Sequence, residues 1–175
     1  MDWMMSPVQS VQDFMVMGGD VLKVIAIAIF LMWLLIFERL IYFRTTLKAM
    51  QKEIHDQWEA RPERKSWYAK QIRQAMISRF AIAARSGLPI IQTLVALCPL
   101  LGLMGTVTGM IAVFDVMALS GTGNARSMAS GVSLATVPTM AGMIGALSGV
   151  FLVTMITRAI ETRVEDLQDH LTMDH

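Results

Sequence analysis

Charged residues are scarce in this chain of 175 residues, and three long stretches contain none. Asp, Glu, Lys and Arg make up 17% of the sequence, against about 25% in an ordinary soluble domain. They are missing from residues 24–37, 86–114 and 127–157, which are 14, 29 and 31 residues long. Roughly 20 apolar residues span a bilayer, so the second and third stretches qualify as they stand. An ordinary water-soluble domain is therefore excluded.

The first uncharged stretch is short for a bilayer, but its flanks extend it. Lys23 can snorkel to the headgroups, and residues 40–43 continue the apolar helix beyond Glu38 and Arg39. We therefore expect an all-α integral membrane protein with three transmembrane helices. Their expected bounds are 19–43, 88–118 and 127–157.

Basic residues are unevenly distributed between the two sides of these spans. Eleven of the fifteen Lys and Arg residues lie between residues 39 and 85, and the first twenty residues contain none. By the positive-inside rule, the segment 44–87 and the C-terminal segment 158–175 are cytoplasmic. The N-terminus and the loop 119–126, whose one basic residue is Arg126, are then outside.

Residues 1–18 lack the basic region with which a cleaved signal peptide begins. Their apolar side chains, among them Trp3, Val11 and Phe14, favour a short helix lying on the outer surface of the membrane. A frayed tail is the alternative.

The cytoplasmic segment 44–87 is predicted to be helical, with a break at Pro62. We expect its two arms to continue the first and second spans beyond the lipid. Pro89 and Pro99 allow the second spanning helix to kink. Segment 158–175 is expected to continue the third helix into the cytoplasm.

Cysteine and histidine are too few and too scattered for a catalytic or metal site. The single cysteine, Cys98, lies within a span and excludes a disulfide inside the chain. Residues 131–135 come near a nucleophile elbow, but His55, His170 and His175 all lie outside the spans. We therefore expect no enzymatic activity, no catalytic residue, no cofactor and no metal.

Small residues are concentrated in the second and third spans. Two pairs of glycines have the small-xxx-small spacing that lets helices approach closely in lipid, Gly105 with Gly109 and Gly145 with Gly149. The glycines predicted to pack helices together are Gly102, Gly105, Gly109, Gly142, Gly145 and Gly149.

Threonines form a second pattern on the same helices. With the loop centre near residue 122, Thr106 lies sixteen residues before it and Thr139 seventeen after it. In an antiparallel hairpin these two hydroxyls lie at nearly the same depth, and Thr136 and Ser133 extend the polar stripe outward. The four residues could line a narrow wet path. The alternative is that each threonine donates to a carbonyl of its own helix.

Charges close to the spans are few and lie at their edges. Asp115 lies at the outer edge, where an interfacial anchor is expected, and Glu38 and Arg39 mark the inner end of the first span, where they could pair. No titratable group lies at mid-membrane, and a proton relay normally needs one. If protons cross here, another chain must supply the carboxylate.

Two stretches carry a family resemblance. ALCPLLGLMGTVTGMI, residues 96–111, resembles the "APLLGLLGTVxGMI" signature of the MotA/TolQ/ExbB proton-channel family. MASGVSLATVPTMAGM, residues 128–143, resembles the "GIxxALxTTxxGL" segment in the last span of that family. The order of the motifs, the three spans and the basic cytoplasmic segment are similar to the ExbB and TolQ type.

The resemblance implies a role for two residues and a set of partners. Thr106 and Thr139 match threonines that face a central pore, formed by several copies of the subunit, generally five. The pore holds two transmembrane helices of an ExbD- or TolR-like single-span partner, whose intramembrane aspartate titrates. Proton motive force at the bacterial inner membrane would then drive a motor that energises a TonB-like protein for uptake of iron chelates or vitamins. The resemblance implies lipid contact, and neither nucleotide, metal nor nucleic acid.

The sequence departs from the family pattern at two positions. Leu134 stands where the best-known ExbB and TolQ proteins have a glutamate, and Pro138 is a second local variation. The missing carboxylate argues against proton relay by this subunit, though not against a role as pore wall. A TolQ-like role in envelope constriction and a passive helical scaffold remain alternatives. A MotA-type flagellar stator is disfavoured because it has four spans and a much larger cytoplasmic region.

Overall fold

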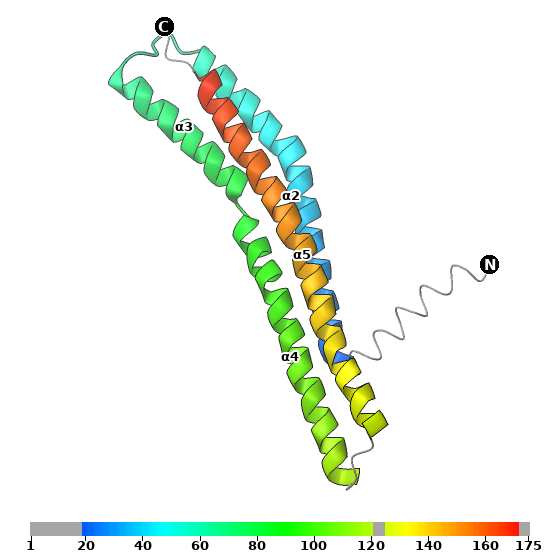
Figure 1. The fold of residues 1–175 in the computed structure, drawn as a ribbon. Helices are drawn as coiled ribbons and strands as arrows, with labels where there is room; N and C mark the ends of the chain where they lie inside the picture. The colour runs from blue at the N-terminus through cyan, green and yellow to red at the C-terminus, as the bar shows by residue number, and fades with distance from the viewer. Residues whose placement is uncertain (1–18, 121–124, 172–175) are drawn as a thin grey trace, which may run out of the picture. The chain divides into compact units, whose positions relative to one another are not determined.

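The computed structural model describes residues 19–120 and 125–171 of the chain. Four helices account for its regular structure: α2 (Gly19–Glu59), α3 (Trp67–Arg85), α4 (Leu88–Ser120) and α5 (Ala125–His170) (Figure 1). No strand occurs in these two ranges, so the all-α prediction is confirmed. The surface helix expected over residues 1–18 and the centre of the loop 119–126 lie outside the described residues.

Three helical stretches are long and apolar enough to cross a membrane, as predicted. They are Gly19–Glu59, Trp67–Leu119 and Met128–His170. Each is longer than the roughly 20 residues that a bilayer needs. The orientation of the spans and their bounds within these helices stay predictions.

The chain reverses direction between α2 and α3 at the break predicted from Pro62. α2 ends at Glu59, whose carbonyl accepts a hydrogen bond of 2.8 Å from the Arg64 guanidinium. α3 begins after Ser66, whose side-chain oxygen caps the helix by accepting from the backbone N–H of Ala69 at 3.2 Å. The break therefore has a satisfied polar group on each side of the turn.

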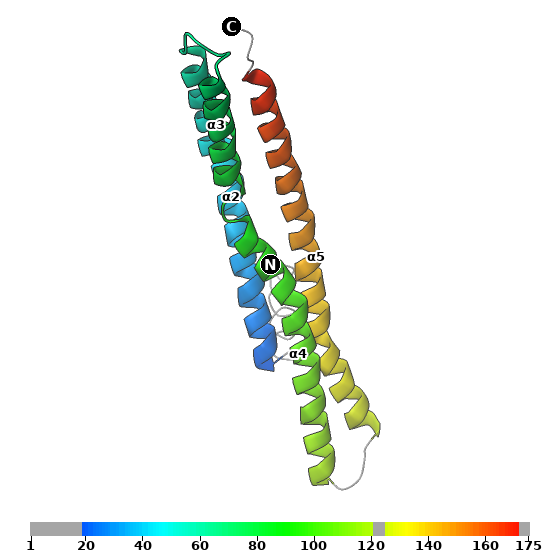
Figure 2. The same ribbon diagram turned by 90° about the vertical axis from the view of Figure 1, so that its left-hand side faces the viewer.

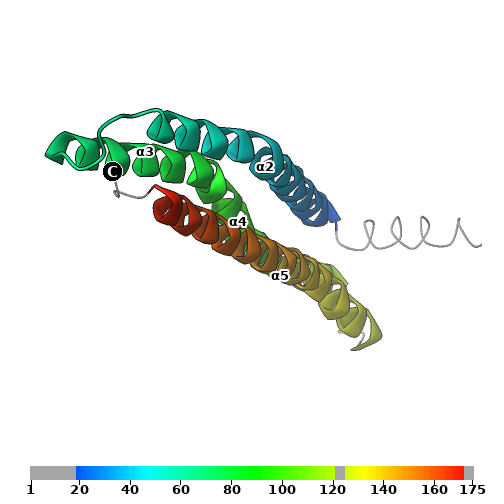
Figure 3. The ribbon, with the colours of Figure 1, turned by 90° about the horizontal axis from the view of Figure 1, so that it is seen from above.

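Residues 34–91 and 151–171 form one compact unit, in which α2, α3 and α5 lie side by side (Figures 2 and 3). Its buried side chains include Trp58 from α2, Phe80 from α3 and Leu167 from α5. Arg73 of α3 ties down the end of α5: its Nε donates to the Leu171 carbonyl and its Nη2 to the Gln168 carbonyl, both at 2.7 Å. These bonds satisfy carbonyls that the end of a helix leaves without a partner.

Arg39 is the one buried charged residue among those described, with 7% of its surface exposed. Its guanidinium lies over the ring of Tyr42, 4.7 Å from the ring centre, which is a cation–π arrangement. Glu38 is exposed, and no ion pair joins it to Arg39. The expected local pair does not form because adjacent helix positions do not face each other.

Gly87 makes room for this arginine at the break between α3 and α4. A Cβ at Gly87 would lie 3.2 Å from Nε of Arg39, and the residue has φ +83°, which favours glycine. Pro89 follows in the first turn of α4, where a missing N–H costs little. In place of the kink that Pro89 allows, the structure has a break in the helix at Ser86–Gly87.

Gly87→Ala is expected to lower the free energy of unfolding by about 1–2 kcal/mol, because the left-handed backbone is costly for alanine. Contact with the Arg39 guanidinium adds to this cost. Thermal unfolding in detergent measures the effect. Gly19→Ala is the control: Gly19 also has a positive φ, +64°, but a Cβ there meets no described atom within 4 Å. Equal losses in the two variants would contradict a role for the Arg39 contact.

Candidate functional site: a threonine pair between α4 and α5

Residues 19–33, 92–120 and 125–150 form the second compact unit, in which the backbones of α4 and α5 approach closely. A Cβ on Gly109 would lie 2.6 Å from Cβ of Ala135, and one on Gly142 only 2.5 Å from the carbonyl oxygen of Cys98. A Cβ on Gly102 would lie 3.0 Å from the carbonyl oxygen of Pro138. Glycine is needed at these three positions because any side chain would collide with the facing helix. In lipid, where the hydrophobic effect does not drive helices together, this close packing holds the pair.

The other predicted packing glycines contact side chains, and all three reach α2; a Cβ on Gly105 would lie 3.1 Å from Cγ1 of Val21. The Cβ position of Gly105 is filled by the Pro138 ring, and that of Gly145 by the end of Ile29 on α2. At Gly149 the neighbours are Val95 of α4, at 2.5 Å, and Met32 of α2, at 2.6 Å. All six glycines thus lie against a neighbouring helix. The sequence did not indicate which helix each one faces.

Thr106 and Thr139 meet in the middle of this close contact. Their hydroxyls hydrogen-bond to each other across the two helices. Thr139 Oγ1 donates to the carbonyl of Gly102 at 2.9 Å, and Thr106 Oγ1 lies 3.4 Å from the same oxygen. Since a hydroxyl has one proton, Thr139 donates to Gly102 and accepts from Thr106. The two threonines that the sequence places at one depth therefore form a short polar chain, and both are half-buried.

Thr136 and Ser133 do not join this pair. Both are exposed on α5, and the Thr136 hydroxyl donates to the Ser133 carbonyl of its own helix at 2.8 Å. Thr108 on α4 behaves in the same way, with its hydroxyl 3.1 Å from the carbonyls of Met104 and Gly105. Thr136 and Thr108 thus donate to carbonyls of their own helices, which is the alternative considered above.

Comparison with known proteins shows the family of the chain. The model of the MotA/TolQ/ExbB proton channel family matches residues 41–169, which include α3, α4 and nearly all of α5. This chain belongs to that family. It is also 44% identical over 66 residues to a protein of Synechocystis sp. whose name describes it as ExbB-like 1, a biopolymer transport protein. That alignment covers 36% of this chain and 26% of the relative, so the chain spans about a quarter of its length.

As a MotA/TolQ/ExbB member with three apolar helices, the chain is a multi-pass membrane protein. The two positions that depart from the family pattern differ in their surroundings. Leu134 is an exposed apolar side chain on α5, whereas Pro138 is buried against Gly105. Pro138 has no backbone N–H, so the carbonyl of Leu134 loses its usual helical donor. The sequence identified Pro138 only as a variation, because its contact depends on how the two helices are rotated.

The Gly102 carbonyl is a second feature that sequence reasoning missed. It accepts a hydrogen bond from Thr139 across the helix contact because Gly102 has no side chain to keep Thr139 away. The only sequence signal for it is that Gly102 stands four residues before Thr106, which is where a helical threonine usually donates. The Gly102 carbonyl is thus part of the site, beside the two hydroxyls.

The parts of α4 and α5 that carry the polar chain contain no charged residue. Residues 86–114 and 127–157 contain no Asp, Glu, Lys or Arg, and Asp115 at the end of this stretch of α4 is exposed. Hydroxyls and carbonyls can donate to and accept from a neighbouring group, but they do not ionise near neutral pH. Chemically, the pair can solvate and orient a proton-carrying group; it cannot carry the proton as a charge of its own.

Proposed function

We propose that this chain is the ExbB-like subunit of a bacterial inner-membrane complex driven by the proton motive force. An ExbD-like single-span protein would be its partner, and a TonB-like protein would receive the work for outer-membrane uptake of iron chelates or vitamins. The observation that supports this most is the hydrogen-bonded pair Thr106–Thr139, which lies in two stretches, 86–114 and 127–157, that contain no Asp, Glu, Lys or Arg. We propose no enzymatic activity for the chain.

The chemistry of the pair fits one half of a proton site. A proton that crosses a membrane needs a titratable group along its path. Residues 86–114 and 127–157 offer no acidic or basic side chain apart from the buried thiol of Cys98. The half-buried Thr106 hydroxyl can turn its proton from Thr139 to a carboxylate on another chain. Each elementary charge that crosses yields about 2.3 kcal/mol per 100 mV. Repeated protonation and release of the partner's carboxylate would convert this energy into motion.

Exposed apolar side chains support assembly into a ring of several copies, which we propose to be five. α4 exposes Ile111 and Phe114, and α5 exposes Ile144, Leu147 and Phe151, each by 55% or more. In a membrane such side chains contact lipid or a neighbouring helix, and a ring provides both environments. Thr106 and Thr139, with the exposed Thr136 and Ser133, would then face its central pore.

Deletion of the gene tests the proposed cargo and role. Energy-dependent uptake of iron chelates should fall to the level seen with a protonophore, because no proton flow would reach the TonB-like protein. Radiolabelled siderophore uptake measures this, and a plasmid copy should restore it. Normal uptake combined with detergent sensitivity and faulty constriction would instead identify the TolQ-like role. Native mass measurement after co-purification with the ExbD-like partner gives the number of copies.

A further inference from the structure

An open cavity of about 230 Å³ lies between α2 and α5, within the unit formed by residues 34–91 and 151–171. Its lining comes from positions that repeat every three or four residues, so each helix contributes one face. The lining residues are Lys48, Gln51, Lys52 and His55 of α2 with Arg163, Leu167 and His170 of α5. We call this cavity the basic groove. The threonine pair makes no use of it.

The basic groove is lined by cations and by no carboxylate. Lys48, Lys52 and Arg163 bring three positive charges to one cavity. Arg163 is held in place from two sides: its Nη1 donates to Oε1 of Gln51 at 3.2 Å, and its guanidinium lies 5.6 Å from the ring centre of Phe43. Its orientation is thus set before any ligand arrives. Like charges in one cavity repel, and a bound anion would remove that repulsion.

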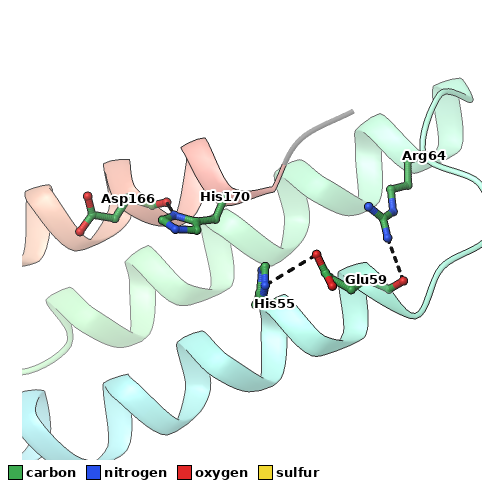
Figure 4. A network of polar contacts seen from close by, with 5 residues as sticks. All are labelled: His55, Glu59, Arg64, Asp166 and His170. Atoms are coloured by element: carbon green, nitrogen blue, oxygen red, sulfur yellow. Dashed lines mark hydrogen bonds and ion pairs between the residues drawn. The ribbon is translucent and has the colours of Figure 1, made fainter. Parts of the chain in front are cut away.

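Two histidines close the far end of the groove from opposite helices. The rings of His55 and His170 lie edge to face with centres 6.2 Å apart, and Figure 4 shows them between α2 and α5. Nδ1 of His170 lies 2.6 Å from the Asp166 carbonyl, so this nitrogen is the donor, while the Asp166 carboxylate points away (Figure 4). Glu59 reaches Nε2 of His55 only at 3.8 Å. Among the described residues, no carboxylate forms an ion pair with Lys48, Lys52 or Arg163.

The charge and size of the groove together select a small oxyanion. Arginine and lysine side chains are the usual ligands of phosphate in proteins, arginine through two parallel hydrogen bonds. A volume near 230 Å³ lies below the about 300–1,000 Å³ of pockets for drug-sized ligands, so a bulky ligand would not be enclosed. We propose that the basic groove binds the phosphate group of a small soluble anion, held by Lys48, Lys52 and Arg163.

Position along the helices favours a soluble ligand over a lipid headgroup. Lys48 and Arg163 lie five and six residues beyond the expected span ends at 43 and 157, and His55 and His170 lie twelve and thirteen beyond. At a rise of about 1.5 Å per residue, the groove extends from about 8 to about 20 Å past the hydrocarbon core. The headgroup layer reaches only about 5–8 Å on each side. Most of the groove is therefore in the aqueous phase.

Calorimetric titration of inorganic phosphate into the purified full chain, in nanodiscs of phosphatidylcholine, tests the proposal. We expect saturable binding that sulfate displaces at matched ionic strength. Arg163→Gln and Lys52→Gln should each weaken binding by about tenfold or more, because each removes a charged ligand of the phosphate. Lys70→Gln, which removes an exposed lysine of α3 outside the groove, should bind as the parent does.

Thermal unfolding separates a ligand site from a purely structural role. Without phosphate, Lys52→Gln should unfold at the same temperature as the parent or higher, because one repelling charge is gone. The rise in unfolding temperature that phosphate gives the parent should be lost in this variant. The proposal is overturned by absence of saturable binding, by loss of phosphate binding in nanodiscs of anionic lipid, whose headgroups would then occupy the groove, or by equal affinity in Arg163→Gln, Lys52→Gln and the parent.

Discussion

Thr139→Val should reduce proton-driven activity by at least about tenfold while leaving the hairpin folded. Valine has the shape of threonine, but it cannot donate to the Gly102 carbonyl or accept from Thr106. The bond that we propose between this pair and a carboxylate is a hydrogen bond to a charged group, which is worth about 1.5–3 kcal/mol, or about ten- to a hundredfold in rate or affinity. The loss should appear in energy-dependent uptake in cells and in proton flux into vesicles containing the chain and the proposed ExbD-like partner.

Two matched variants show whether the hydroxyl itself is responsible. Thr139→Ser keeps the hydroxyl and should retain most of the activity. Thr108→Val removes a neighbouring hydroxyl that bonds only to carbonyls of its own helix, and should behave as the parent does. Unchanged uptake and proton flux in Thr139→Val, at equal protein level, would refute the pore-wall role and favour a passive scaffold.

Gly142→Ala is expected to give the largest loss of stability, at about 1–3 kcal/mol or somewhat more. The added Cβ would lie 2.5 Å from the carbonyl oxygen of Cys98 and 3.3 Å from Cα of Gly102. These are backbone atoms of α4, which cannot turn aside as the end of a side chain can. The helices must separate, and the Thr106–Thr139 bond should lengthen with them. Unfolding in detergent titrated with SDS measures the loss.

Gly145→Ala is the control for this substitution. It stands one helical turn from Gly142 on α5, but its Cβ would meet the end of the Ile29 side chain, which can rotate away. We expect a loss well below that of Gly142→Ala. If the two variants lost equal stability, the rigidity of the α4 backbone would not be the cause.

The spans and the turns of this fold could be predicted from the sequence because they depend on local composition. The absence of charge from residue 86 to residue 114 marks the second span directly. Pro62 likewise marks the break between α2 and α3, only a few residues from the helix ends. The matched positions of Thr106 and Thr139 about the loop also predict the centre of the site. Depth in an antiparallel hairpin follows from counting residues, since each adds the same rise.

Features that depend on helix rotation could not be predicted in this way. Thr136 and Thr139 are three residues apart, yet only Thr139 reaches the other helix. Burial of Pro138 against Gly105 is set by the same rotation. The pairing of Gln51 with Arg163 joins residues 112 positions apart, and no local pattern marks one as the partner of the other. Such contacts are determined by tertiary packing.

The bonds from Arg73 to the end of α5 also bear on how the protein is made. Arg73 leaves the ribosome well before its partners, because Gln168 and Leu171 lie 95 and 98 residues further along the chain. During that interval α4 and the first part of α5 must be synthesised and inserted into the membrane. Until the last turn of α5 has been made, the Arg73 guanidinium of α3 lacks these two carbonyl acceptors. Completion of this contact is a late step in biogenesis, and α3 of a newly made chain stalled before residue 168 should remain accessible to an added protease.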